Sequence, residues 1–150
     1  MQRRRLFLVA AVAWGLGAGA CTASNEVIHG FGTTQTWTLS ISSRVPAARG
    51  KISVLAGKDG NQTVDLEVQR LAEPAQVFEG TSTYVVWLVP PDSPPTNIGV
   101  LPLDMHLKGR LQTKTPYREF DVEVTAEPSP TVTQPSANTK VMGASVRVPT

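Results

Sequence analysis

The sequence is poor in cysteine and histidine, the residues that form disulfides in small folds and bind metals. Its 150 residues include one cysteine, Cys21, and two histidines, His29 and His106. A single cysteine excludes an intrachain disulfide, so we expect a hydrophobic core alone to stabilise the fold. The usual zinc sites take several Cys and His ligands, and a blue-copper site needs a thiolate beside its histidines. The composition therefore argues against both kinds of metal site.

The chain also lacks a clear excess of charge of either sign. Its 14 Lys and Arg residues and 12 acidic residues give a formal net charge of +2. Three of the cations, Arg3, Arg4 and Arg5, lie at the extreme N-terminus, and without them 11 cations face 12 acids, a net charge of −1. The basic footprint of a nucleic-acid-binding protein is missing, so we expect no nucleic-acid partner.

Recognisable catalytic motifs are missing as well. No G-x-S-x-G nucleophile elbow occurs, and neither histidine has a serine and an acid near it in a familiar order. Asp104 and His106, two residues apart in "LDMHLKG", would share one face of a strand and could hold a metal with a third ligand. A solvated strand end explains the same letters. We therefore predict a protein that is not an enzyme and has no cofactor, with Asp104 and His106 as weak metal candidates.

The N-terminus has the three-part pattern of an export signal. The basic start is followed by an apolar run from Leu6 to Trp14 and by small residues up to Ala20. The run is too short for a spanning helix, which needs about 20 apolar residues, and it fits a secretory signal peptide. Ala18-Gly19-Ala20-Cys21 resembles the lipobox of bacterial lipoproteins, with Ala18 where leucine is usual. That resemblance implies cleavage before Cys21 and attachment of fatty acyl chains such as palmitate to it.

We accordingly divide the chain into a lipoprotein signal peptide (1–20), a lipidated N-terminus and tether (21–33) and one domain (34–150). The expected location is the bacterial cell envelope, with the lipid on Cys21 in the outer membrane and the domain facing the periplasm. An ordinary signal peptide cut near Ala20 is the alternative. A free thiol in an exported protein would risk intermolecular disulfides, which favours the lipid.

After the tether, apolar and polar residues alternate with a period of two, as in strands with one buried face. "TYVVWLVPP" is apolar on both faces, which predicts a strand covered on both sides and ended by Pro90 and Pro91. Turn residues separate the strands at intervals of roughly 10 residues. We therefore predict an immunoglobulin-like antiparallel β-sandwich of seven or eight strands. The expected strands include 36–42, 64–69, 84–89, 98–103, 107–113, 119–128 and 144–149, a further strand begins at Ile52, and the candidate core residues are Trp37, Val54, Leu66, Val85, Trp87, Leu111, Phe120 and Val122.

Three polar clusters could suggest further sites. Alternating oxygen donors at 59–65 resemble part of a calcium loop, but Val64 stands where an EF-hand requires glycine. We expect a tight hairpin there, with Asp59 and Gly60 at positive φ. The carboxylates of 64–68 and 120–124 should point to solvent, opposite cations such as Lys108, Arg110 or Arg118. Arg44, Arg49 and Lys51 could touch anionic headgroups or be ordinary loop charges.

The strands "TYVVWLVPP", "NIGVLPL", "LQTKTPYREFDVEVTAEP" and "TVTQPS" resemble a family of uncharacterised bacterial envelope lipoproteins and secreted β domains. More distantly, "YVVWLV" resembles the extracytoplasmic domain of anti-sigma factors. The resemblance implies a fold and a compartment, with Tyr84, Trp87, Pro116, Phe120 and Glu127 in packing and turn roles and Trp87 between the sheets. It implies no catalytic residue.

The prediction is thus a lipid-anchored, non-enzymatic structural or protein-interaction module, with an unidentified envelope protein as its partner. The alternative is a periplasmic domain that binds a small molecule or a metal.

Overall fold

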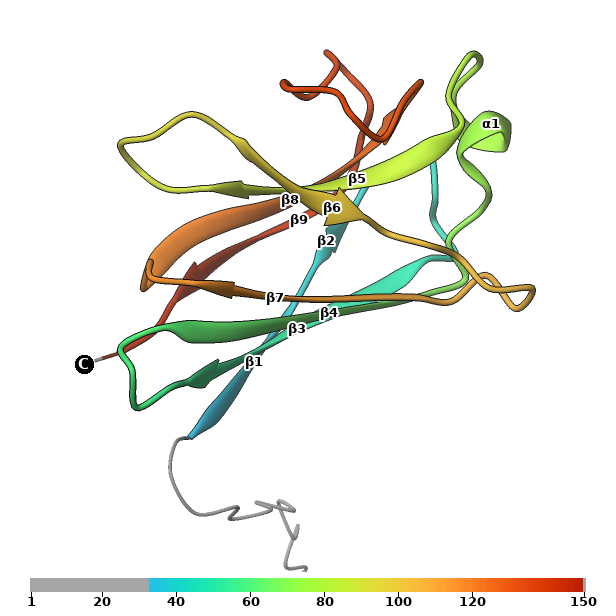
Figure 1. Ribbon diagram of the computed structural model, residues 1–150. Coiled ribbons are helices and arrows are strands. Elements are labelled where there is room, and N and C mark those ends of the chain that lie inside the picture. Colours follow the sequence, from blue (N-terminus) through green and yellow to red (C-terminus); the bar gives the residue numbers. More distant parts are fainter. Residues whose placement is uncertain (1–32, 150) are drawn as a thin grey trace, which may run out of the picture.

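The computed structural model describes residues 33–149 as an antiparallel β-sandwich, which confirms the predicted fold class (Figure 1). The signal peptide, Cys21 and the tether up to residue 32 lie outside the described residues. One sheet has four strands in the order β1-β3-β4-β7 and the other has five in the order β2-β9-β8-β5-β6. A single turn of helix, α1 (Pro74–Val77), precedes β5. No helix within residues 33–149 is long and apolar enough to cross a membrane.

The strand bounds follow the alternation in the sequence. Val64, Leu66 and Val68 point inward from β4 while Asp65 and Glu67 point outward. The strands are β1 (Thr34–Thr38), β2 (Ser40–Ile41), β3 (Arg49–Ala56), β4 (Gln62–Gln69), β5 (Thr83–Val89), β6 (Thr96–Val100), β7 (Gly109–Thr115), β8 (Glu119–Glu127) and β9 (Lys140–Arg147).

Residues 33–149 form nine strands where the sequence suggested seven or eight, because the expected strand 36–42 divides at Leu39. Before Leu39 the chain pairs with β3 in the four-stranded sheet, and after it the chain pairs with β9 in the five-stranded sheet. Leu39 is buried, and its N–H donates to the Gly50 carbonyl at 2.9 Å. The first strand therefore crosses between the sheets through the core instead of staying on one side.

The core lies between the two sheets and contains four of the eight predicted core residues, Val54, Leu66, Phe120 and Val122. Trp37 and Leu111 are partly buried and pack against its edge. Val85 and Trp87 are fully buried, as predicted for core residues, but the expectation that Trp87 lies between the sheets is wrong. Their neighbours Tyr84, Val86 and Leu88 belong to the core, so successive residues of β5 alternate faces and place Trp87 on the outer face of the five-stranded sheet.

A cover segment, residues 128–139, lies over the part of that outer face that holds Trp87 and Glu127, whereas Glu119 and Asp121 further along β8 stay exposed (Figure 1). The Trp87 indole N–H donates to the Thr125 hydroxyl at 2.8 Å, and this hydroxyl donates to Glu127 at 2.6 Å. The Glu127 carboxylate also accepts hydrogen bonds from the backbone N–H and the hydroxyl of Ser136. Asn97 on β6 donates to two further carbonyls of the cover segment. The proline-rich crossing is thus fixed by a buried polar network.

Candidate functional site

Asp104 and His106 do not share a strand face, and this prediction is wrong. Residues 104–108 form a turn that is enclosed by an isolated β-bridge between Leu103 and Gly109, the first residue of β7. The Asp104 Oδ1 atom accepts hydrogen bonds from the backbone N–H groups of His106 (2.8 Å) and Lys108 (2.9 Å). These bonds, that of Lys108 foremost, lower the pKa of Asp104. The carboxylate therefore holds the turn closed.

The turn requires an unusual backbone conformation at Leu107, whose φ is +58°. The Leu107 carbonyl accepts a hydrogen bond from the Leu71 N–H at 3.2 Å. Arg70, the residue before Leu71, also has a positive φ, of 55°. Within residues 33–149, no three His, Cys, Asp or Glu side chains gather so that they could hold a metal ion.

The turn also shortens the two strands expected on either side of it. The expected strands 98–103 and 107–113 appear as β6, which ends at Val100, and β7, which begins at Gly109.

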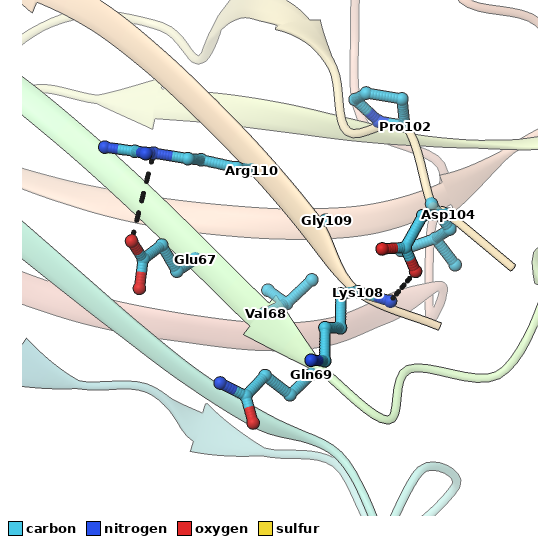
Figure 2. Close-up of a pocket in the computed structure, with 9 residues that line it drawn as sticks. Glu67, Val68, Gln69, Pro102, Asp104, Lys108, Gly109 and Arg110 are labelled. Atoms are coloured by element: carbon cyan, nitrogen blue, oxygen red, sulfur yellow. Dashed lines mark hydrogen bonds and ion pairs between the residues drawn. The ribbon is translucent and has the colours of Figure 1, made fainter. Parts of the chain in front are cut away.

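An open cleft of about 510 Å³ lies beside this turn (Figure 2). Its walls are the last residues of β4, the first residues of β7 and the segment 102–104. Gly109 lets this segment approach closely, since a Cβ there would lie 2.8 Å from the Pro102 carbonyl oxygen. His106 is not among the lining residues, which are Glu67, Val68, Gln69, Pro102, Leu103, Asp104, Lys108, Gly109 and Arg110.

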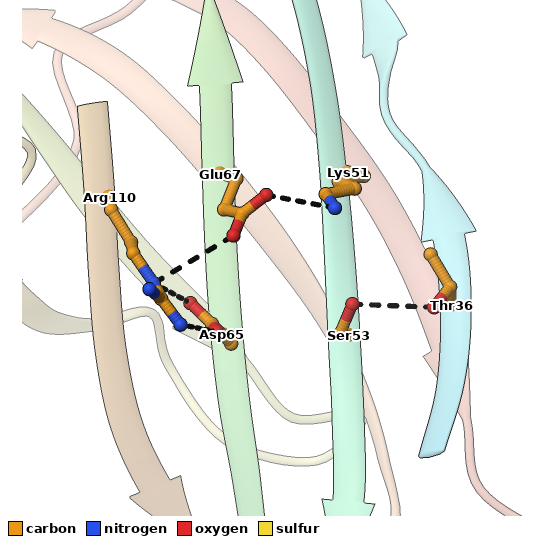
Figure 3. Close-up of polar contacts among 6 residues, drawn as sticks. All are labelled: Thr36, Lys51, Ser53, Asp65, Glu67 and Arg110. Carbon is orange, nitrogen blue, oxygen red and sulfur yellow. Dashed lines mark hydrogen bonds and ion pairs between the residues drawn. The ribbon is translucent and has the colours of Figure 1, made fainter. Parts of the chain in front are cut away.

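The cleft continues into the outer face of the four-stranded sheet, where charged side chains form rows across the strands (Figure 3). In one row, Lys51, Glu67 and Arg110 are direct neighbours in register. Glu67 lies 2.9 Å from the Lys51 ammonium and 3.8 Å from the Arg110 guanidinium. Arg110 also forms a two-pronged ion pair with Asp65, which raises the pKa of Arg110. This face is polar and held by paired charges.

Two carboxylates of the other sheet have comparable partners. Glu123 pairs with Lys140 at 2.6 Å, and Glu119 pairs with Arg147 at 2.8 Å. The prediction of cross-strand ion pairs is correct for Arg110, whereas the other cations are Lys51, Lys140 and Arg147 instead of Lys108 or Arg118. Register between strands far apart in the sequence selects these partners.

The polar cluster of the 57–61 hairpin has a structural use. In the 57–61 hairpin only Gly60 has a positive φ, so the expected pair of positive-φ residues is wrong. Asp59 accepts hydrogen bonds from the backbone and side chain of Asn61, and these lower the pKa of Asp59.

The basic residues around Pro46 diverge instead of forming a common patch. Arg44 stacks on the Phe78 ring at 4.8 Å, Arg49 donates to the Pro46 and Ala48 carbonyls, and Lys51 pairs with Glu67.

Two features were missed at the level of sequence. The row of cations on β7 includes Lys114, and the alternation "KGRLQTK" was a readable signal for it. The structural role of Glu127 as the acceptor for the cover segment had no local signal, because its partner Ser136 comes from a proline-rich stretch without periodicity.

Comparison with known proteins gives no match: no family model, no curated protein and no solved structure matches this chain.

Proposed function

We propose that this chain is a lipid-anchored, non-enzymatic module of the bacterial cell envelope that binds another envelope protein. The observation that supports it best is the use of the domain's carboxylates. Asp65, Glu67, Glu119 and Glu123 pair with cations across the strands, and Glu127 holds the cover segment. These are structural uses, and they leave the outer face of the four-stranded sheet polar.

The anchor in this proposal rests on the sequence Ala18-Gly19-Ala20-Cys21. The first strand begins at Thr34, so a lipid on Cys21 would hold the domain within about 45 Å of the bilayer even if the tether were fully extended. Several buried acyl chains contribute about 0.8 kcal/mol per methylene. A partner in the same envelope would therefore be met at a high effective concentration.

The proposal is tested with the full-length chain and its Cys21→Ser variant expressed in a bacterium. The wild-type chain should stay with membranes through a high-salt wash, and its intact mass should correspond to a chain that begins at Cys21 and carries a glyceride and fatty acids. The Cys21→Ser variant should accumulate as uncleaved precursor. A soluble wild-type chain without added lipid would refute the anchor. A capture experiment from native envelopes, with a lipidated unrelated domain as control, tests the partner.

A further inference from the structure

Strand β7 forms an edge of the four-stranded sheet and is open to a further strand. It pairs with β4 from Gly109 to Thr115, and on its other side the described residues 33–149 supply only the Leu103–Gly109 bridge. The residue before this bridge is Pro102, which has no N–H and cannot extend the ladder. The chain itself therefore begins a strand next to β7 and stops after one residue pair.

The other sheet edges differ from β7. Strand β2 has only two residues, and β6 carries a register shift and is bound through Asn97 to the cover segment. Strand β1 (TQTWT) has no charged residue. By contrast, Lys108 just before β7 and Arg110 and Lys114 on it lie at even-numbered positions, with Gln112 between the last two, and all three cations are exposed. This edge is both open and positively charged.

Two rows of side chains on the outer face end in a cation at this edge, Arg110, which also pairs with Asp65, and Lys114. Across the strands the first row runs from Lys51 through Glu67 to Arg110, so its signs alternate and its last member is a cation (Figure 3). The next row contains Asp65 and ends at the neutral Gln112, and the row after it ends at Lys114, opposite the neutral Thr63. Opposite charges directly across a strand pair stabilise it, whereas like charges destabilise it. A fifth strand with acidic residues would continue the alternation.

We propose that the β7 edge binds an extended acidic segment of a partner protein, which adds to the four-stranded sheet as a fifth strand. Main-chain hydrogen bonds to β7 would supply affinity and acidic side chains opposite Arg110 and Lys114 would supply specificity. The cleft of about 510 Å³ at the start of the strand lies on the same face and offers Lys108 to a further acidic side chain (Figure 2). This inference rests on the proposed function as a protein-binding module.

The same charges act against pairing of β7 with a second copy of itself. Antiparallel pairing centred on Gln112 would place Arg110 of one chain opposite Lys114 of the other. Cations on an edge strand are a common protection against such association. The β7 edge would thus bind an acidic strand more tightly than a neutral strand or a second copy of β7.

The test uses the isotope-labelled full-length chain in detergent micelles and short synthetic peptides that alternate Glu with Thr or Lys with Thr. The Glu peptide should bind and shift the amide resonances of β7, and the Lys peptide should not. Two further Glu peptides carry N-methyl groups on alternate residues. Only the one whose free N–H groups face β7 should bind, because the other cannot form the ladder.

Two matched double variants separate the edge from general electrostatics. Lys108→Gln with Lys114→Gln should weaken binding about 3- to 10-fold, as expected for the loss of cross-strand charge pairs. Lys140→Gln with Arg147→Gln removes the same charge from the other sheet and should leave affinity unchanged. Far-UV circular dichroism verifies that both variants fold.

Equal binding of the Lys peptide, binding of both methylated peptides, resonance shifts confined to other strands, or no binding at all would each overturn the assignment. A chain that carries lipid on Cys21 but fails this test keeps the proposed envelope function and loses the β7 site. A chain that binds the Glu peptide but lacks lipid loses the anchor and keeps the site.

Discussion

Replacing Glu127 by alanine tests whether the buried polar network fixes the cover segment. Glu127 is fully buried, and its carboxylate accepts hydrogen bonds from Thr125 and from the N–H and hydroxyl of Ser136. The Glu127→Ala variant leaves these donors without their acceptor and opens a void beneath residues 128–139. Thr125 is also the acceptor of the Trp87 indole N–H, so the loss reaches the buried tryptophan.

The expected cost follows from opposing terms. A hydrogen bond to a charged group contributes about 1.5–3 kcal/mol, and removal of one partner from a buried charged network costs about 3–5 kcal/mol. Removing the carboxylate also removes the penalty for keeping it away from water. We therefore expect Glu127→Ala to lower the free energy of unfolding by about 2–4 kcal/mol, out of a total that is typically 5–15 kcal/mol.

The free energy is measured by urea denaturation followed by far-UV circular dichroism, and amide hydrogen exchange reports on the cover segment. Exchange should accelerate at Ser136, whose N–H loses its acceptor, and tryptophan fluorescence should shift to longer wavelength as water reaches Trp87. Glu127→Gln retains one acceptor oxygen and a similar shape, so it should cost less than the alanine variant.

Glu123→Ala is the matched control. Glu123 lies on the same strand and the same outer face, but its carboxylate is partly exposed and pairs with Lys140. Such exposed pairs contribute about 0–1 kcal/mol. If Glu127→Ala and Glu123→Ala destabilise the protein equally, the network does not hold the cover segment and the reasoning fails.

Four further outcomes are expected. Trp87→Ala should cost about 3–5 kcal/mol, and an unchanged melting temperature would contradict its burial. Burial raises the pKa of Tyr84. The protonated hydroxyl therefore stabilises the folded protein fully at pH values below the ordinary pKa of 10.0, and this stabilisation is lost as the pH rises above that value. Absorbance titrations of the wild-type and Tyr84→Phe proteins should coincide until alkaline unfolding, because Tyr84 does not ionise while the protein is folded. The pKa of Asp104 is lowered in the folded protein, so the ionised carboxylate stabilises the fold above about pH 4, and this stabilisation is lost as the pH falls. The carboxyl carbon resonance of Asp104 should therefore titrate below about pH 4. Gln62 is fully buried with an unpartnered side-chain oxygen, so Gln62→Met should raise the urea midpoint, and a lower midpoint would contradict this.

The sequence alone predicted the β-sandwich because the period of two is a local property of each strand. Val64, Leu66 and Val68 could be assigned to the core from alternation with Asp65 and Glu67, and Pro90 ended β5 because it has no N–H to donate. These assignments depend on neighbours within a few residues, and register with other strands does not alter them.

Tertiary structure alone decided which of two apolar faces lies between the sheets. In β5 both faces are apolar, so the alternation cannot tell whether Trp87 faces the core or the cover segment. The answer depends on residues 128–139, about forty residues further along the chain. In the same way, Leu39 carries the first strand from one sheet to the other because Gly50 accepts its N–H.

For the candidate sites, too, the sequence determined some features and only the tertiary structure decided others. The spacing of Asp104 and His106 suggested one strand face, but both residues lie in a turn that is closed by backbone hydrogen bonds to Asp104 and by a positive φ at Leu107, which no local pattern specified. The cations of β7 could be read from their spacing. That they line an open edge became evident only from the strand order, because long-range pairing determines which strand of a sheet comes last.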